Sequence, residues 1–294
     1  MRTNGQIAAV VLLAAFATVG CSKPFEEPET KAQQQLPVSA QAKAIAVPTA
    51  GELPTRSVGP VSFADADAAY QAKNYSEATT LFEQYTEQRP NNAWGHFMLG
   101  LSAWKAGDLM KAEGAFEEAL RIDPNHVKSL VNLSRVLIDQ RLYDAAVIRL
   151  THASEVDPNS VDVQRLLGRV YAAAHKTDEA VIAYRRAIEL DAQDAWSMNN
   201  LGLLFLEQDR AEEALPLLCR AVQLRNDVAA FHNNLGMALE HTGRFLAAAE
   251  QYRGALTADP GYGKAKQNLA RVEAVKTGPE EPFDLAAMAQ RSGE

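Results

Sequence analysis

The sequence lacks an excess of basic residues. Its 294 residues include 29 Lys and Arg against 37 Asp and Glu, so the net charge is −8. Proteins that bind nucleic acids carry a basic patch or stripe, and the chain offers no such footprint. The acidic residues are spread out, and no block of like charge suggests an acidic interaction tail. We therefore expect no nucleic-acid partner.

Residue patterns that carry catalysis or bind metals are also missing. The sequence has no Gly-rich phosphate loop and no Gly-x-Ser-x-Gly nucleophile elbow. None of the histidines stands in a zinc-like spacing with Cys, Asp or Glu; they are His96, His126, His152, His175, His232 and His241. We expect no enzyme, no cofactor and no metal site.

The N-terminus has an apolar run that is too short to span a bilayer comfortably. Arg2 precedes 13 uncharged residues, 7–19, whereas about 20 are needed for a transmembrane helix. A basic start, a short apolar run and small residues are typical of a secretory signal peptide, here residues 1–20. A short transmembrane anchor is the alternative interpretation.

Residues 18–21, Thr-Val-Gly-Cys, resemble the bacterial lipobox, although Leu is usual where Thr18 stands. The resemblance implies a diacylated Cys21, cleavage after Gly20 and acylation of the new amino terminus. Two or more acyl chains anchor a protein stably, whereas one binds only marginally. Ser22 in place of the Asp that usually retains lipoproteins at the inner membrane favours the outer membrane, on its periplasmic face. The membrane is thus an expected partner, bound through N-terminal acyl chains.

Cysteine is otherwise scarce, because Cys219 is the only other one. With Cys21 lipidated no intramolecular disulfide remains, and we interpret Cys219, which follows Leu218 in a predicted helix, as a packing residue. Residues 22–60 contain six of the 13 prolines and show no apolar periodicity. Such a segment cannot bury enough apolar surface to offset its ordering entropy, so we expect 21–60 to be a disordered Pro/Gln/Ala-rich tether.

What the sequence does contain is a constant period of 34 residues. An alanine begins each unit of the pattern, and a large side chain follows four residues later. In every unit but the first, a second alanine follows three residues after that. The first alanines are Ala78, Ala112, Ala146, Ala180, Ala214 and Ala248. The large residues are Phe82, Phe116, Leu150, Tyr184, Leu218 and Tyr252. A Leu-Gly pair recurs at 99–100, 167–168, 201–202 and 235–236.

This pattern resembles the tetratricopeptide repeat over residues 59–262. The resemblance implies an all-α, right-handed superhelical solenoid of six helix-turn-helix repeats: 59–92, 93–126, 127–160, 161–194, 195–228 and 229–262. Repeat 1 departs from the pattern with Asp65 where Leu is expected. We expect residues 263–276 to form a capping helix and 277–294 a flexible tail, with a tail folded into its own groove as the alternative.

The resemblance places positions 2, 5, 6, 9, 12 and 13 of each repeat on the concave face. Asparagine collects there at position 6, as Asn132, Asn200, Asn234 and Asn268, and at position 5, as Asn199 and Asn233. A side-chain amide both donates and accepts hydrogen bonds, so a ladder of amides could hold a peptide backbone of any sequence. The repeat domain of O-linked N-acetylglucosamine transferase has a similar ladder. The alternative is that asparagine is simply common at this position.

Arginines and aromatics complete the predicted groove. Arg135, Arg165, Arg169 and Arg271 would suit acidic or C-terminal carboxylate groups, or they pair with nearby acids. Trp94, Phe97, Trp104 and Trp196 are either anchors for a partner or core residues.

These features together predict a non-catalytic scaffold that binds extended segments of partner proteins. In architecture the chain resembles the pilotin lipoproteins of type IV pili and TadD, the assembly lipoprotein of the tight-adherence (Flp) pilus. This resemblance implies a role in pilus or secretin assembly, with secretin or pilus components as partners. The alternative is a general periplasmic scaffold that recruits envelope enzymes, such as polysaccharide export or cell-wall machinery.

Overall fold

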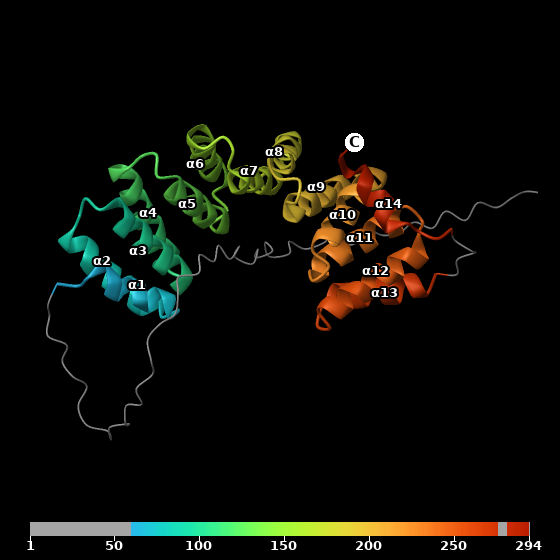
Figure 1. Ribbon diagram of the computed structural model, residues 1–294, viewed down its shortest axis with the longest axis horizontal. Coiled ribbons are helices and arrows are strands. Elements are labelled where there is room, and N and C mark those ends of the chain that lie inside the picture. Colours follow the sequence, from blue (N-terminus) through green and yellow to red (C-terminus); the bar gives the residue numbers. More distant parts are fainter. Residues whose placement is uncertain (1–59, 276–280, 294) are drawn as a thin grey trace, which may run out of the picture. The chain divides into compact units, whose positions relative to one another are not determined.

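The computed structural model describes residues 60–275 and 281–293 (Figure 1). The chain divides into two units, residues 1–55 and 56–294, and the described residues belong to the second. The expected signal peptide, the lipidated Cys21 and nearly all of the tether lie outside the described residues. Within them the chain is helical and no strand occurs, so the predicted all-α fold is confirmed.

In residues 60–275, thirteen helices follow one another as repeats of two helices and a final single helix. Five of the first helices begin at the first residue of a 34-residue repeat: Ala93, Val127, Val161, Ala195 and Ala229. The helices are α1 (Phe63–Gln71), α2 (Tyr75–Gln88), α3 (Ala93–Ala106), α4 (Leu109–Ile122), α5 (Val127–Asp139), α6 (Tyr143–Val156), α7 (Val161–Ala173), α8 (Thr177–Leu190), α9 (Ala195–Glu207), α10 (Ala211–Leu224), α11 (Ala229–His241), α12 (Phe245–Ala258) and α13 (Gly263–Glu273).

Asp65, the residue that breaks the repeat pattern, has a local role at the start of α1. The Ser62 hydroxyl accepts a hydrogen bond from the Asp65 amide, and the Asp65 carboxylate accepts one from the Ser62 amide. This reciprocal capping satisfies two backbone donors that have no partner inside the helix. The first repeat therefore begins with a helix despite its atypical sequence.

The core of each repeat depends on a small residue at position 8. At Gly168 an added Cβ would lie 2.5 Å from the Tyr184 ring, and at Gly236 it would lie 2.5 Å from the Tyr252 ring. At Gly100 and Gly202 an added Cβ would lie 2.7 Å from Phe116 and Leu218, respectively. The Leu-Gly pair thus lets the large residue of the second helix pack directly on the backbone of the first.

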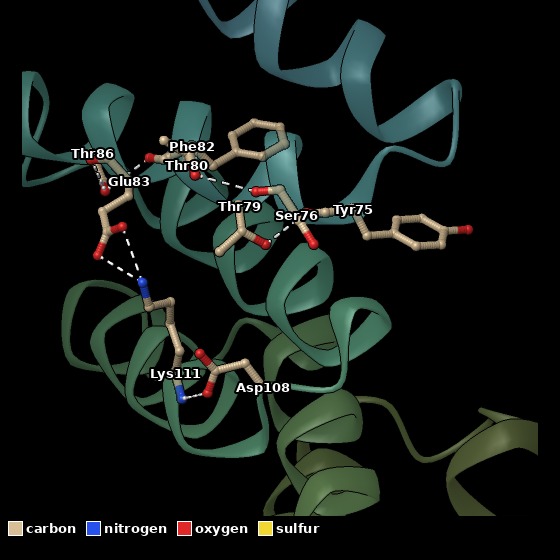
Figure 2. A network of polar contacts seen from close by, with 9 residues as sticks. All are labelled: Tyr75, Ser76, Thr79, Thr80, Phe82, Glu83, Thr86, Asp108 and Lys111. Atoms are coloured by element: carbon tan, nitrogen blue, oxygen red, sulfur yellow. Dashed lines mark hydrogen bonds and ion pairs between the residues drawn. The ribbon is translucent and has the colours of Figure 1, made fainter.

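Polar contacts also join consecutive repeats. Figure 2 shows Lys111 of α4 reaching Glu83 of α2, with Nζ 3.0 and 3.1 Å from the two carboxylate oxygens. The hydroxyls of Thr79 and Thr86 donate to carbonyl oxygens of their own helix, at Tyr75 and Phe82, so these buried side chains have partners (Figure 2). Half-exposed ion pairs contribute little, about 0.2–1 kcal/mol each, so the apolar core dominates stability.

The first helices form one side of the array. Helix α3 contacts α5, α7 contacts α9, and α11 contacts both α9 and α13, whereas each second helix packs mainly between the first helix of its own repeat and that of the next. First helices that approach one another more closely than second helices do must lie on the inside of the curve. Their exposed side chains therefore face the concave side.

The C-terminal tail departs from expectation. Residues 281–293 are not an irregular tail, because they contain α14 (Leu285–Gln290), with Asp284 as its N-cap, and a short 3₁₀ turn. Helix α14 packs on α10, a second helix, beside which it lies in Figure 1. The described part of the tail therefore does not occupy the face formed by the first helices. Its apolar side chains Leu285, Met288 and Ala289 explain the docking.

The close approach at position 8 predicts that two glycine-to-alanine substitutions change the free energy of unfolding in opposite directions. Gly168→Ala should destabilise the chain by about 1–3 kcal/mol, because the new methyl group overlaps Tyr184. Gly114→Ala, also in a helix but with nothing within 4 Å of an added Cβ, should stabilise it by about 0.5–1 kcal/mol. Thermal or urea unfolding measures both. Equal effects of the two substitutions would contradict this packing account.

Candidate functional site

Two hydrogen bonds link asparagines of neighbouring repeats on the face formed by the first helices. The Asn234 amide on α11 donates to the Asn199 oxygen on α9 at 2.9 Å. The Asn268 amide on α13 donates to the Asn233 oxygen on α11 at 3.0 Å. Each bond joins position 6 of one repeat to position 5 of the repeat before it. The asparagines therefore connect three consecutive first helices.

Bonds within each pair make these links continuous. Asn233 donates to Asn234 at 3.5 Å, and Asn199 donates to Asn200 at 3.2 Å. At the C-terminal end, Arg271 donates to the Asn268 oxygen at 3.0 Å. We call this chain of donors and acceptors the amide relay; in order it comprises Arg271, Asn268, Asn233, Asn234, Asn199 and Asn200.

The amide relay divides the predicted ladder into two kinds of residue. Asn199 and Asn233 are 5% and 2% exposed, so their amides serve the connection between repeats. Asn200, Asn234 and Asn268 are half-buried and reach the surface. A carboxamide has two donor hydrogens and two acceptor lone pairs, and Asn234 uses one of each in the relay. Its remaining donor and acceptor are held in a fixed orientation by the bonds already made.

Asn132 stands apart from the relay. It is buried on α5, where its amide donates to the Lys128 carbonyl at 2.8 Å and its oxygen accepts from Arg135 at 3.3 Å. Position 6 of repeat 4 is Leu166, so no side-chain amide bridges α5 to α9 at this position. The sequence grouped Asn132 with the later asparagines because it shares their position, and the structure separates it from them.

Two of the four predicted groove arginines, Arg165 and Arg271, pair with acidic residues of the chain. Arg165 on α7 pairs with Asp162 and with the buried Asp194, whose carboxylate lies 2.8 Å from Nη1. Asp194 also caps α9 through the Ser197 amide and hydroxyl. Arg165 therefore ties repeat 4 to the start of repeat 5.

Arg169 differs from the other groove arginines. It is half-buried on α7, one turn beyond Arg165, and makes no hydrogen bond or ion pair with any residue in the described ranges. Its guanidinium keeps its full set of donors for an external acceptor. Of the four arginines named from the sequence, this one has the geometry that suits a carboxylate of a partner.

Arg271, Glu240 and Tyr252 form a polar cluster that fixes the capping helix. The Arg271 guanidinium binds both Glu240 carboxylate oxygens, at 2.8 and 2.7 Å, and the Tyr252 hydroxyl donates to the same carboxylate at 2.8 Å. Burial acts to raise the pKa of Glu240, but these hydrogen bonds outweigh it and the pKa is lowered. Arg271 thus holds α13 to α11 while it orients Asn268.

The aromatic residues divide between surface and core. Trp94 on α3 is 41% exposed, with the Lys128 ammonium 4.9 Å from its ring centre. Phe97 is buried beside it, and Trp196 packs edge-on against the buried Phe231. The Trp104 indole donates to Asp139 at 3.2 Å. Trp94 is therefore the aromatic of this set that presents the most surface.

The described residues offer neither a metal site nor a membrane span. No group of three or more His, Cys, Asp or Glu there could hold a metal ion. No helix in residues 60–275 or 281–293 is both long and apolar enough for a membrane span. Cys219 is buried, and burial raises the pKa of its thiol to about 12, so it is an inert packing residue in this structure.

Three family models match the chain. The middle TPR-like domain of cilia and flagella-associated protein 70 matches residues 64–181, a TPR repeat model matches 168–209, and a tetratricopeptide repeat model matches 199–263. No curated protein sequence matches the chain.

Solved structures share the fold at low sequence identity. PilF of Pseudomonas aeruginosa is 18% identical with a TM-score of 0.61, over 71% of this chain and 95% of PilF. MamA from Desulfovibrio magneticus RS-1 is 19% identical with a TM-score of 0.52, over 55% of this chain and 91% of MamA. YrrB, a TPR protein with an unusual peptide-binding site, is 18% identical with a TM-score of 0.51, over 63% of this chain and 96% of YrrB.

The lowered pKa of Glu240 predicts a pH-dependent link between α11 and α13. A carboxylate whose pKa is lower in the folded state contributes stability above its ordinary value of 4.5 and loses it as the pH falls through the folded pKa. Glu240→Gln should therefore cost about 1 kcal/mol at pH 7 and progressively less as the pH is lowered below 4.5. Glu117→Gln, on an exposed pair with Arg149, should cost little at either pH. A Glu240→Gln penalty that did not change with pH would contradict the ion-pair account.

Proposed function

We propose that this tetratricopeptide repeat protein is a non-catalytic scaffold that binds an extended segment of a partner protein along the face formed by its first helices. The amide relay carries this proposal. It places the half-buried amides of Asn200, Asn234 and Asn268 on α9, α11 and α13 in turn, each fixed by a neighbouring side chain. Amides held in this way can pair with a peptide backbone without first losing rotamer freedom.

The charges on this face suggest the chemistry of the bound segment. Arg169 has no partner among the described residues and lies on α7, next to the repeat where the relay ends at Asn200. A guanidinium recognises carboxylates through two parallel hydrogen bonds. We expect the segment to carry an acidic side chain or a C-terminal carboxylate near Arg169. That YrrB, which shares the fold, has a peptide-binding site is consistent with this mode of binding.

The proposed cellular setting rests on the N-terminal sequence. A lipobox-like end at Cys21 and a proline-rich segment ahead of six repeats suit an outer-membrane lipoprotein that faces the periplasm. We extend the proposal to pilus or secretin assembly, in which the groove would hold a partner segment while the acyl chains bring the complex to the membrane. A scaffold for polysaccharide export or cell-wall enzymes is the competing role.

A groove variant tests the binding mode. The combined Asn200→Ala, Asn234→Ala and Arg169→Ala variant should lower recovery of the natural partner at least about tenfold, because it removes amide and guanidinium contacts worth roughly 1 kcal/mol or more each. The measurement is quantitative mass spectrometry of proteins that co-purify from native membranes. The control is Arg185→Ala, an exposed residue on the second helix α8. Unchanged recovery from a folded groove variant would show that the partner binds elsewhere.

The identity of the recovered proteins decides between the two roles. Secretin or pilus components that depend on the groove residues would support the assembly role. Polysaccharide-export or cell-wall enzymes with the same dependence would support the competing scaffold. Recovery of neither a secretin nor a pilus protein would remove the assembly proposal.

The anchor has its own test. Cys21→Ser should abolish incorporation of a labelled fatty acid and move the protein from the membrane fraction to the soluble fraction, because the acylated thiol is lost. Cys219→Ser is the matched control, since that thiol is buried and should not affect fractionation. Persistent acylation and membrane recovery of the Cys21→Ser chain would contradict the lipoprotein assignment.

A further inference from the structure

One second helix has an apolar residue where the others are polar. At position 25 of its repeat, α10 carries Cys219, which is 0% exposed. The equivalent residues of the other repeats reach solvent; they are Glu83, Glu117, Thr151, Arg185 and Arg253. A side chain at this position points to the outer face of the array. The burial of Cys219 therefore requires a covering element that the other repeats do not have.

Helix α14 is that element. In addition to its neighbours α9 and α11, α10 contacts α14 and the turn that follows it. Leu285, Met288 and Ala289 recur at the spacing of one helix face and join the apolar cluster that contains Cys219, with Ala289 only 1% exposed. Ala286 and Gln290, on the opposite face, are exposed. The tail is thus a short amphipathic helix on the outer surface of repeat 5.

We propose that the outer face of α10 is a second binding site, separate from the groove, that takes a short amphipathic helix of a partner protein, and that α14 fills this site in the isolated chain. The binding mode is the laying of an apolar helix face on an apolar surface. The ligand class is defined by α14 itself, which has an acidic N-cap, large apolar residues at the first and fourth helical positions and an alanine at the fifth.

The contacts of α14 leave room for a stronger ligand. The helix has six residues, and isolated helices of this length are not stable in water, so it depends on docking for its structure. Phe283, Leu285 and Met288 stay partly exposed. A cleft of about 400 Å³ lies beside α14, lined by Ala287 and Met288 and by Arg244 at the start of α12. A partner helix with a larger side chain in place of Ala287 would fill space that α14 leaves empty.

A second copy of the chain is a weaker candidate for the occupant. Its tail would be identical to α14 and would compete with a helix that is joined to α13 through residues 276–280. A short connection gives an effective concentration on the order of millimolar, which an identical segment in solution does not reach under ordinary conditions. A different helix with better contacts can overcome this advantage. The geometry therefore favours a partner of another sequence.

The test uses Cys219 as a reporter of the covered face. In the full chain, Leu285→Asp with Met288→Asp should undock α14 and raise the rate of Cys219 alkylation at pH 8 at least about tenfold, measured by peptide mass spectrometry. The control, Ala286→Asp with Gln290→Asp, adds the same charge on the exposed side of α14 and should leave the rate unchanged. Circular dichroism checks that both variants remain folded.

Peptides then separate a binding site from a structural contact. The peptide of residues 281–293, added to the undocked variant, should slow Cys219 alkylation again, and the same peptide with Ala287→Leu should do so at a concentration at least about threefold lower. A peptide carrying both aspartates should give no protection. The proposal would be overturned if Cys219 alkylation stayed slow in the undocked variant. It would also be overturned if alkylation became fast there and the peptides did not slow it. A doubled mass of the wild-type chain by light scattering, absent from the undocked variant, would assign the site to a second copy instead.

Discussion

The architecture depends on the contact between a small residue at position 8 of each first helix and a large residue of the second helix. At Gly168 and Gly236 the tyrosine ring lies where a side chain would begin, so any residue larger than glycine would push the two helices apart. This contact recurs in repeats 2, 4, 5 and 6, so in each of them the large residue of the second helix packs directly on the backbone of the first. The stacking of α9, α11 and α13 on these pairs brings Asn234 to Asn199 and Asn268 to Asn233.

The helices were predictable because the same spacing of small and large apolar residues recurs in each 34-residue repeat. An irregular feature such as Asp65 changes one repeat, and its capping bond to Ser62 shows that a local exception can still start a helix. The amide relay was not predictable in the same way. A period of 34 groups residues by equal position, whereas the bonds join position 6 to position 5 of the previous repeat, 35 residues apart. That offset follows from how neighbouring helices pack and appears in no single repeat.

The groove arginines illustrate the same limit. The repeat position of an arginine predicts that its side chain lies on the concave face. It does not predict whether an acidic residue of the same chain already pairs with that side chain. Asp194 precedes α9 in the sequence as an ordinary helix cap, and it becomes a partner of Arg165 only when repeats 4 and 5 stack. Arg169, one turn further along α7, keeps its donors. The selectivity of the groove is therefore set as much by the acids that occupy arginines as by the arginines themselves.

The helix in the tail was not predicted from the sequence, because six helical residues are too few for periodicity to distinguish from an irregular segment. The residue that indicates a docked tail is Cys219, which lies in α10 and not in the tail itself. A repeat protein offers an internal comparison at every position, and a buried Cys219 among exposed polar equivalents marks a surface that is covered. Departures of this kind carry the information specific to one chain. The repeated residues build the array, while the two proposed binding sites rest on paired asparagines on its inner side and on an apolar patch on its outer side. Two faces with such different chemistry, one offering fixed amides and the other an apolar surface under a short helix, suit two different ligands held at the same time.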